Sequence, residues 1–181
     1  LSFSMQKTKS EIDSIIESLL LIFRKFQVTC IFTYPNNDAG SNYIIKKIKN
    51  FNKNNKNVQL FKSLGRKDYW GILNLVKYNF KVICMGNSSS GIKETAGFCC
   101  PTLNIGNRQK GRMTGENVIH CSAESKIIYK KISNILKEDT FFKKCKKYKN
   151  PYGKGNAGKE IISFLEKLKL NKDLNIKKMT I

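Results

Sequence analysis

Apolar residues occur along the chain in two alternating patterns. Segments 10–24, 40–51, 68–77, 91–97, 127–136 and 157–169 carry them at helical spacing, which predicts amphipathic helices. Short apolar runs lie between most of these helices, at 28–34, 58–61, 81–85, 102–105 and 118–121, and these predict strands. Thr8 and Glu11 have the spacing of a capping box, so we expect the first helix to begin close to residue 10.

Strands and helices that alternate at this short spacing are typical of an α/β fold. Continuous apolar strands bounded by turn residues indicate parallel strands covered on both faces. We therefore predict a Rossmann-like, open parallel sheet with helices on both faces. In such sheets ligands bind at the carboxyl ends of the strands, so the polar loops that follow the strands are the candidate sites.

The chain length of 181 residues predicts one domain with a short extension. We place the domain at residues 1–169 and a lysine-rich, loose tail at 170–181. No apolar run reaches the ~20 residues that span a bilayer, and no secretory signal is present, so we expect no membrane partner. The chain begins with Leu1, and we expect further residues upstream.

The formal net charge of +21 invites a nucleic-acid interpretation. However, 30 of the 34 basic residues are lysines, which are scattered along the whole chain. Arginine, which suits bidentate contacts with phosphate and guanine, is nearly absent. A general drift of surface positions toward lysine accounts for the charge, so we predict no specific nucleic-acid binding.

Six cysteines without a CxxC pair favour free thiols in a reducing, cytoplasmic compartment over a disulfide framework. A single histidine, His120, cannot build a histidine-rich metal site, and the cysteine spacings do not fit structural zinc. We therefore expect no metal. We interpret His120 as structural and Trp70 as a packing residue.

The loop after the strand at 81–85 is the sharpest candidate site. It contains Ser88, Ser89, Ser90 and Gly91, followed by Glu94 in the first turn of a helix. Small residues, hydroxyl donors and a helix N-terminus together suit a phosphate group, and a carboxylate in that turn can accept both hydroxyls of a sugar diol. A serine-rich turn with an ordinary N-cap explains the same residues equally well.

Three further loops precede helices or follow strands. The loop at 104–112 carries Arg108, Gln109 and Arg112, and either arginine could clamp a diphosphate, although an exposed basic loop is the simpler interpretation. In the loop at 33–41, Asn36 and Asp38 read as turn and cap residues when the segment is taken alone. Residues 150–157 form a glycine-rich turn before the last predicted helix.

Five segments stand out in order along the chain: PNNDAGS at 35–41, GNSSSGIKE at 86–94, GNRQKGR at 106–112, TGENV at 114–118 and NPYGKGN at 150–156. Taken together, in this order and spacing, they resemble the C-terminal half of the hydrolysing UDP-N-acetylglucosamine 2-epimerases. The resemblance covers about residues 1–168.

The resemblance implies a two-domain GT-B fold, with the active site between two Rossmann-like halves and the nucleotide bound mainly to the C-terminal half. It implies hydrolysis of UDP-N-acetylglucosamine to N-acetylmannosamine and UDP, a step of sialic acid biosynthesis. The reaction proceeds by anti elimination of UDP and addition of water, without metal or cofactor. By position, the implied UDP-binding residues are Asn36, Leu64, Ser88, Ser89, Glu94 and Arg108, with Ser90, Gly91, Gln109 and Arg112 as additional candidates.

Two features depart from the family. Its acid/base residues and catalytic histidine belong to an N-terminal half that this chain lacks, so we expect the chain alone to bind UDP weakly and to be inactive. A further UDP-contacting histidine should fall near Ser4 and Met5, where the chain has none. The missing N-terminal domain and, as in many relatives, a homo-oligomer are the expected partners.

Three other functions remain compatible with these features. A GT-B glycosyltransferase shares the sugar-nucleotide cradle but transfers the sugar to an acceptor other than water. A non-catalytic UDP-sugar-binding remnant would account for the missing half. A basic RNA-binding domain would lose affinity steeply with salt and would not compete with UDP.

Overall fold

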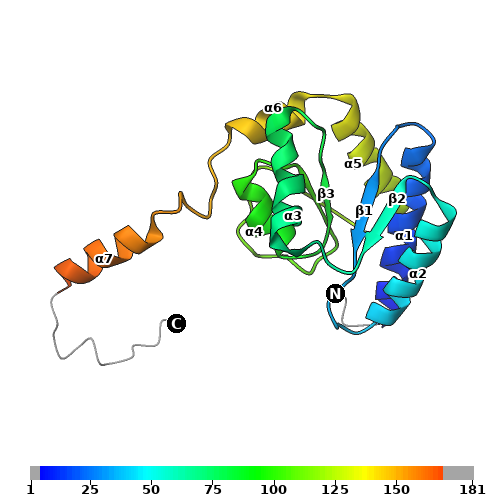
Figure 1. Ribbon diagram of the computed structural model, residues 1–181, viewed down its shortest axis with the longest axis horizontal. Coiled ribbons are helices and arrows are strands. Elements are labelled where there is room, and N and C mark those ends of the chain that lie inside the picture. The colour runs from blue at the N-terminus through cyan, green and yellow to red at the C-terminus, as the bar shows by residue number, and fades with distance from the viewer. Residues whose placement is uncertain (1–4, 169–181) are drawn as a thin grey trace. The chain divides into compact units, whose positions relative to one another are not determined.

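The computed structural model describes residues 5–168. The chain divides into two compact units, Leu1–Pro151 and Tyr152–Ile181. The described elements, in chain order, are α1 (Met5–Phe23), β1 (Cys30–Thr33), α2 (Ser41–Asn54), β2 (Val58–Phe61), α3 (Gly65–Asn74), the 3-10 turn η1 (Leu75–Tyr78), β3 (Cys84–Gly86), α4 (Ser90–Gly97), β4 (Thr102–Ile105), β5 (Val118–Cys121), α5 (Ser125–Lys137), α6 (Thr140–Lys147) and α7 (Ala157–Lys167) (Figure 1).

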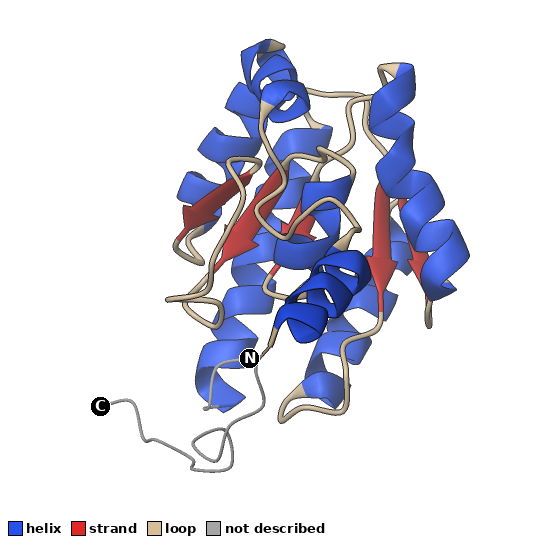
Figure 2. Cartoon of the chain, turned by 90° about the vertical axis from the view of Figure 1, so that its left-hand side faces the viewer, coloured by secondary structure: helices blue, strands red, loops and turns tan. Residues whose placement is uncertain are grey.

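All strand pairs in the described chain are parallel. β1 pairs with β2, with Cys30 opposite Val58, and β4 lies between β3 and β5. Helices lie on both sides of the strands (Figure 2). The predicted α/β fold with parallel strands covered by helices is therefore confirmed.

The strands form two sheets rather than one continuous sheet, because β1 and β3 do not pair. The backbone before β3 turns on itself: the Val82 N–H donates to the Phe80 carbonyl. β3 then has only three residues, and its Cys84 N–H donates to Pro101, away from β1. Two cavities, of about 280 and 410 Å³, are lined by both β1 and β3. The single open sheet expected from the sequence is thus divided at this point.

Helix α1 packs against both sheets on the same side. Its Ile22 joins Leu103 of β4 and Ile128 of α5 in one buried cluster. Its Leu19 joins Phe51 of α2 and Val58 of β2 in a second cluster. A third cluster, formed by α3, η1 and the segment before β4, contains Leu73, Val76 and Cys100. Burial of these side chains is the main force that assembles the first unit.

Two element boundaries differ from the sequence prediction. The described part of α1 begins at Met5, so Thr8 lies inside the helix and does not cap it at residue 10. Thr8 is buried and lies close to Gly40, so tertiary packing determines the helix in this region. Helix α6 was not predicted as a separate element, because its many lysines hide the apolar positions Phe142 and Cys145, both of which are buried.

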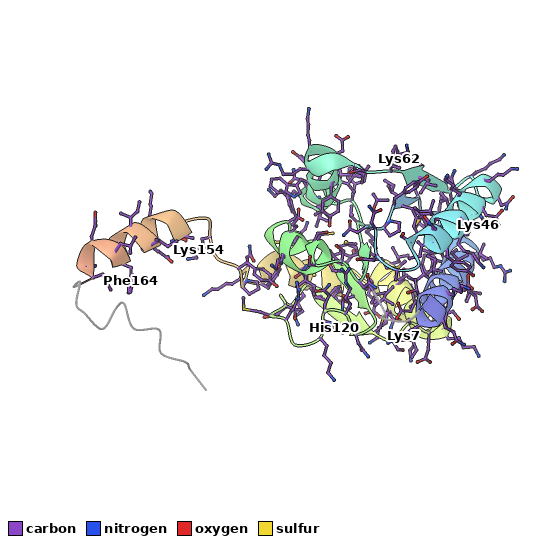
Figure 3. The ribbon with its side chains drawn as sticks, turned by 90° about the horizontal axis from the view of Figure 1, so that it is seen from below. Lys7, Lys46, Lys62, His120, Lys154 and Phe164 are labelled. Atoms are coloured by element: carbon purple, nitrogen blue, oxygen red, sulfur yellow. The ribbon has the colours of Figure 1, made fainter. Side chains whose placement is uncertain are left out.

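The last predicted helix is present as α7, which belongs to the second unit. The predicted tail at 170–181 lies outside the described residues. Within the described part of the chain, no helix has the length and apolar character to cross a membrane. Lysines are spread over many elements, as Lys7 on α1, Lys46 on α2 and Lys62 after β2 illustrate (Figure 3).

Candidate functional site

The serine loop, residues 86–90, connects β3 to α4 and has a well-defined backbone. Gly86 has φ of 142°, a conformation that glycine adopts readily and other residues rarely do. The Ser90 N–H donates to Ser88 Oγ at 3.4 Å, and the Ser89 carbonyl accepts the N–H groups of Ile92 and Lys93. The loop thus delivers the N-terminus of α4, with its partial positive charge, to the carboxyl end of β3.

A first pocket, which we call the Arg108 pocket, has a volume of about 340 Å³. Three of the predicted UDP-binding residues line it: Asn36 after β1, Ser88 after β3 and Arg108 after β4. The loops that follow three strands therefore meet there, as expected for parallel strands whose carboxyl ends share an edge.

The Arg108 pocket also contains two carboxylates, Glu11 of α1 and Asp38 of the β1–α2 loop. The Arg108 guanidinium nitrogen Nη2 lies 3.6 Å from Oδ2 of Asp38. Both side chains are about one-third exposed, so solvent screens this ion pair. The guanidinium therefore lines the pocket in a weak ion pair and remains within reach of an entering anion.

A second pocket, the Glu94 pocket, has a volume of about 590 Å³. Asn36 lines it as well, so the two pockets adjoin through the β1–α2 loop. The predicted residues Leu64, Ser90 and Glu94 line it, together with two cations, Lys62 and Arg66. The two pockets together thus contain Ser88 and Ser90 of the serine loop, the carboxylate and the guanidinium that the sequence singled out.

Helix α3 contacts α4 along the wall of the Glu94 pocket. The indole Nε1–H of Trp70 donates to Oε2 of Glu94. The hydroxyl oxygens of Tyr69 and Ser90 lie 3.1 Å apart. Burial raises the pKa of Tyr69 further above neutral pH, so its hydroxyl is protonated and can donate.

Gln109 is buried and ties the loop after β4 to the serine loop. Its Nε2 donates to the carbonyl of Asn87 at 2.7 Å, directly before Ser88. Its Oε1 is buried and has no hydrogen-bond partner. In this structure Gln109 supports the loop backbone, and its contact with a nucleotide stays a prediction.

Three other predicted residues line neither pocket. Ser89 lies at the N-cap of α4, and Arg112 is exposed beyond Gln109. Gly91 is buried against Thr102 and Cys84 and lines the larger of the two cavities between β1 and β3. The histidine expected from the family would fall near Ser4 and Met5, and Ser4 lies outside the described residues.

Sequence reasoning missed two contacts in the site. It interpreted Asp38 as a turn residue and Trp70 as a packing residue, whereas both contact predicted site residues. Trp70 does pack, since its ring centroid lies 5.9 Å from that of Phe98. The Asp38 carboxylate and the Trp70 indole could be read from the sequence. However, nothing in their spacing indicates that Asp38 pairs with Arg108 or that Trp70 donates to Glu94.

Burial raises the pKa of the Cys84 thiol beside Tyr69, which keeps it protonated at neutral pH. The described residues include no group of three or more histidine, cysteine or acidic side chains placed to hold a metal ion. The chemistry that the two pockets offer is hydrogen bonding and ion pairing with an anionic ligand that also carries hydroxyl groups.

Residues 4–166 match the family model described as UDP-N-acetylglucosamine 2-epimerase. The chain is 36% identical over 156 residues to the polysialic acid biosynthesis protein P7 of Escherichia coli, covering 86% of this chain and 38% of that protein. It is 33% identical over 120 residues to the GDP/UDP-N,N'-diacetylbacillosamine 2-epimerase (hydrolyzing) of Campylobacter jejuni, covering 66% of this chain and 29% of the relative.

The fold is similar to a crystal structure assigned as a UDP-N-acetylglucosamine 2-epimerase from Listeria monocytogenes. The TM-score is 0.70 at 14% identity, over 86% of this chain and 40% of that one. The chain thus spans less than half the length of these relatives. The family model matches most of the sequence, and the fold agrees with that match. This chain therefore belongs to the UDP-N-acetylglucosamine 2-epimerase family.

Proposed function

We propose that this chain is the UDP-binding half of a UDP-N-acetylglucosamine 2-epimerase. In the complete protein it holds the nucleotide of UDP-N-acetylglucosamine while the sugar is converted to N-acetylmannosamine with release of UDP. The polysialic acid relative supports a place in amino-sugar metabolism of the sialic acid type. The observation that carries the proposal is the meeting of Asn36, Ser88 and Arg108 in one pocket that adjoins the pocket of Glu94.

The distribution of charge supports an assignment of the ligand's parts. Arg108 and the hydroxyl of Ser88 suit the diphosphate, because a guanidinium and neutral donors stabilise phosphate oxygens. Glu94 suits the ribose, because a carboxylate accepts hydrogen bonds from both hydroxyls of a diol. Leu64 supplies an apolar contact in the same pocket, which suits the uracil ring.

The chain's own residues bind and orient the nucleotide in this proposal. General acid and base groups belong to the facing half, which lies outside this chain. The sugar specificity depends on that half as well. The names of relatives refer to different sugars: N,N'-diacetylbacillosamine for the Campylobacter jejuni protein and N-acetylglucosamine for the Listeria monocytogenes structure. The 181-residue chain is therefore expected to bind UDP without turning over UDP-N-acetylglucosamine.

Titration of the 181-residue chain with UDP tests the proposal. Trp70 is the single tryptophan and donates to Glu94, so intrinsic fluorescence reports directly on the proposed site. We expect saturable binding of UDP that Glu94→Ala and Arg108→Ala each weaken by about tenfold or more, as for charged hydrogen-bonding groups. Calorimetry provides the affinities independently of fluorescence.

Two matched variants control for the change of charge. Arg24→Ala and Glu17→Ala remove the same groups from exposed positions on and directly after α1, and neither residue lines the Arg108 or Glu94 pocket. We expect both to bind UDP like the parent chain. Undiminished affinity in both Glu94→Ala and Arg108→Ala would refute the proposed site.

A further inference from the structure

Glu94 lies on α4, but its carboxylate is held by a residue of α3. The Trp70 indole N–H donates to Oε2 of Glu94, and the carboxylate lines the Glu94 pocket beside Asn36 and Ser90. A glutamate side chain on a helix has several rotamers of similar energy, so an unsupported carboxylate would sample many positions. The indole donor selects one of them.

Trp70 is itself held in place from two sides. Its ring packs against Phe98 with centroids 5.9 Å apart, and the Arg66 guanidinium carbon lies 5.3 Å from its ring centroid. Both contacts favour the observed position of the ring, although the residue is 39% exposed. The indole N–H therefore points at Glu94 from a supported ring.

A carboxylate offers about four acceptor sites, and the indole N–H occupies one of them. Oε1 and the remaining lone pairs stay available for a ligand that carries two neighbouring hydroxyls. We propose that Trp70 is a positioning residue that orients Glu94 to accept hydrogen bonds from both hydroxyls of a ribose cis-diol. This pocket would then select ribonucleotides over 2'-deoxyribonucleotides. This inference rests on the proposed nucleotide-binding function and adds the residue that determines selectivity for the sugar of the nucleotide.

Comparison of UDP with 2'-deoxy-UDP on the 181-residue chain tests the inference by calorimetry. Trp70→Phe keeps an aromatic ring against Phe98 and removes the N–H donor together with the five-membered ring. We expect this variant to lower the preference for UDP over 2'-deoxy-UDP by about three- to tenfold, as for one hydrogen bond, with little change in binding of 2'-deoxy-UDP. A purely structural role for Trp70 would weaken binding of both ligands equally.

Phe98→Leu is the matched control, since it weakens the packing, keeps an apolar side chain against the indole ring and keeps the indole donor. We expect it to lower the thermal unfolding temperature while largely preserving the preference for UDP. If Trp70→Phe is folded by circular dichroism and retains the full preference, the inference is wrong although UDP still binds. If the parent chain binds neither nucleotide, the proposed function itself fails.

Glu94→Gln provides a second, independent variant. A neutral amide of nearly the same shape keeps one acceptor oxygen and turns the other terminal atom into a donor, so it cannot accept hydrogen bonds from the indole and from both ribose hydroxyls. We expect it to lose the preference for UDP, and adding Trp70→Phe in this background should cause no further loss. An additional loss in the double variant would show that the two residues act independently and would overturn the inference.

Discussion

The guanidinium of Arg108 lies 3.6 Å from the carboxylate of Asp38, across the two loops that follow β4 and β1. The proposed phosphate-binding cation is therefore paired with an internal anion when no ligand is present. An entering diphosphate must share the guanidinium with this carboxylate and must also tolerate its negative charge.

Replacement of Asp38 with asparagine removes that competing charge. We expect Asp38→Asn to tighten UDP binding by about two- to fivefold at low ionic strength, the range measured for exposed ion pairs. The gain should shrink as salt is added, because screening weakens the repulsion in the parent chain. Calorimetric titrations at two salt concentrations measure both effects, and weaker binding by Asp38→Asn would show that the carboxylate positions Arg108 instead.

Gln109 connects the loop of Arg108 to the loop of Ser88 through one partly buried hydrogen bond to the Asn87 carbonyl. Gln109→Met keeps the approximate shape and leaves that carbonyl without its donor. We expect the free energy of unfolding to fall by about 0.5–1.5 kcal/mol, the net contribution of one hydrogen bond, and UDP binding to weaken. Urea denaturation checks the first effect, and Gln27→Met at an exposed position serves as control. Unchanged stability would contradict the prediction.

Gly40 precedes α2 in the same loop as Asn36 and has φ of 88°. A Cβ at this position would lie 2.9 Å from Cγ2 of Thr8, so alanine would be strained in its backbone and would crowd α1. We expect Gly40→Ala to lower the free energy of unfolding by about 1–3 kcal/mol.

Gly71→Ala is the control for this substitution, because Gly71 lies within α3 and a Cβ there meets nothing within 4 Å. It should raise stability by about 0.5–1 kcal/mol, since alanine favours the helix. Thr8→Ser in the Gly40→Ala background removes the crowding methyl group but not the backbone strain, so we expect only partial recovery. Equal stability of the two alanine variants would refute the prediction.

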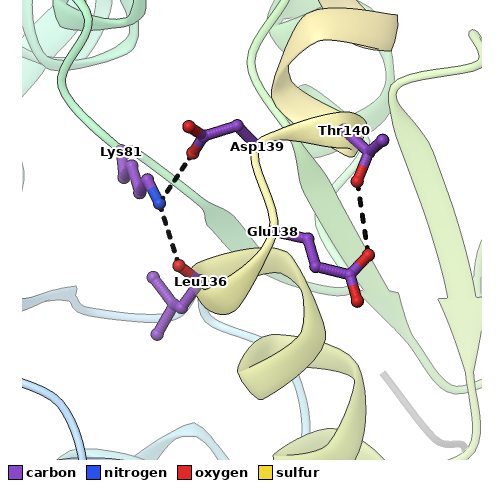
Figure 4. A network of polar contacts seen from close by, with 5 residues as sticks. All are labelled: Lys81, Leu136, Glu138, Asp139 and Thr140. Atoms are coloured by element: carbon purple, nitrogen blue, oxygen red, sulfur yellow. Dashed lines mark hydrogen bonds and ion pairs between the residues drawn. The ribbon is translucent and has the colours of Figure 1, made fainter.

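Lys81 connects the end of α5 to the start of α6. Its Nζ lies 2.8 Å from Oδ1 of Asp139 and donates to the Leu136 carbonyl at 2.9 Å, while Thr140 donates to Glu138 nearby (Figure 4). The hydrogen bond from Lys81, and then its charge, lower the pKa of Asp139. A carboxyl group with a lowered pKa in the folded state stabilises the fold above its unfolded pKa, about 4, and loses this effect as pH falls.

Asp139→Asn should therefore lower the thermal unfolding temperature slightly at pH 7, because the pair is solvent-exposed. The difference from the parent chain should decrease as the pH falls below about 4. Thermal melts across this pH range measure it, with Glu17→Gln as a control at an exposed carboxylate on α1. A difference that grows toward acid pH would reverse the sign and refute the assignment.

Much of the fold could be predicted because the information is local. The helical spacing of Ile44, Ile48 and Phe51 in α2, and the β-branched run at β1, report burial that the structure confirms for Ile48 and Phe51. The predicted start of α1 at residue 10 was wrong. The capping-box spacing of Thr8 is a local signal, whereas in the structure Thr8 is buried inside the helix. The division of the sheet was missed for a similar reason, since strand pairing depends on how the segment before β3 turns.

The candidate site shows the same limit. The serine loop, Glu94 and Arg108 were recognised from composition and spacing, and parallel strands bring their loops to one edge of the fold. The partners of these residues could not be predicted. Trp70 reaches Glu94 only because α3 packs beside α4, and Gln109 turns inward while its neighbour Arg108 turns toward Asp38.

The order of residues alone thus specifies the elements, the parallel α/β class and the chemical groups available after each strand, because hydrophobic period and turn chemistry are properties of short segments. The tertiary structure alone decides which of those groups touch: Arg108 with Asp38, Trp70 with Glu94, and Gln109 with the serine loop. Contacts between distant segments depend on how whole helices and loops pack, and no local pattern encodes that geometry.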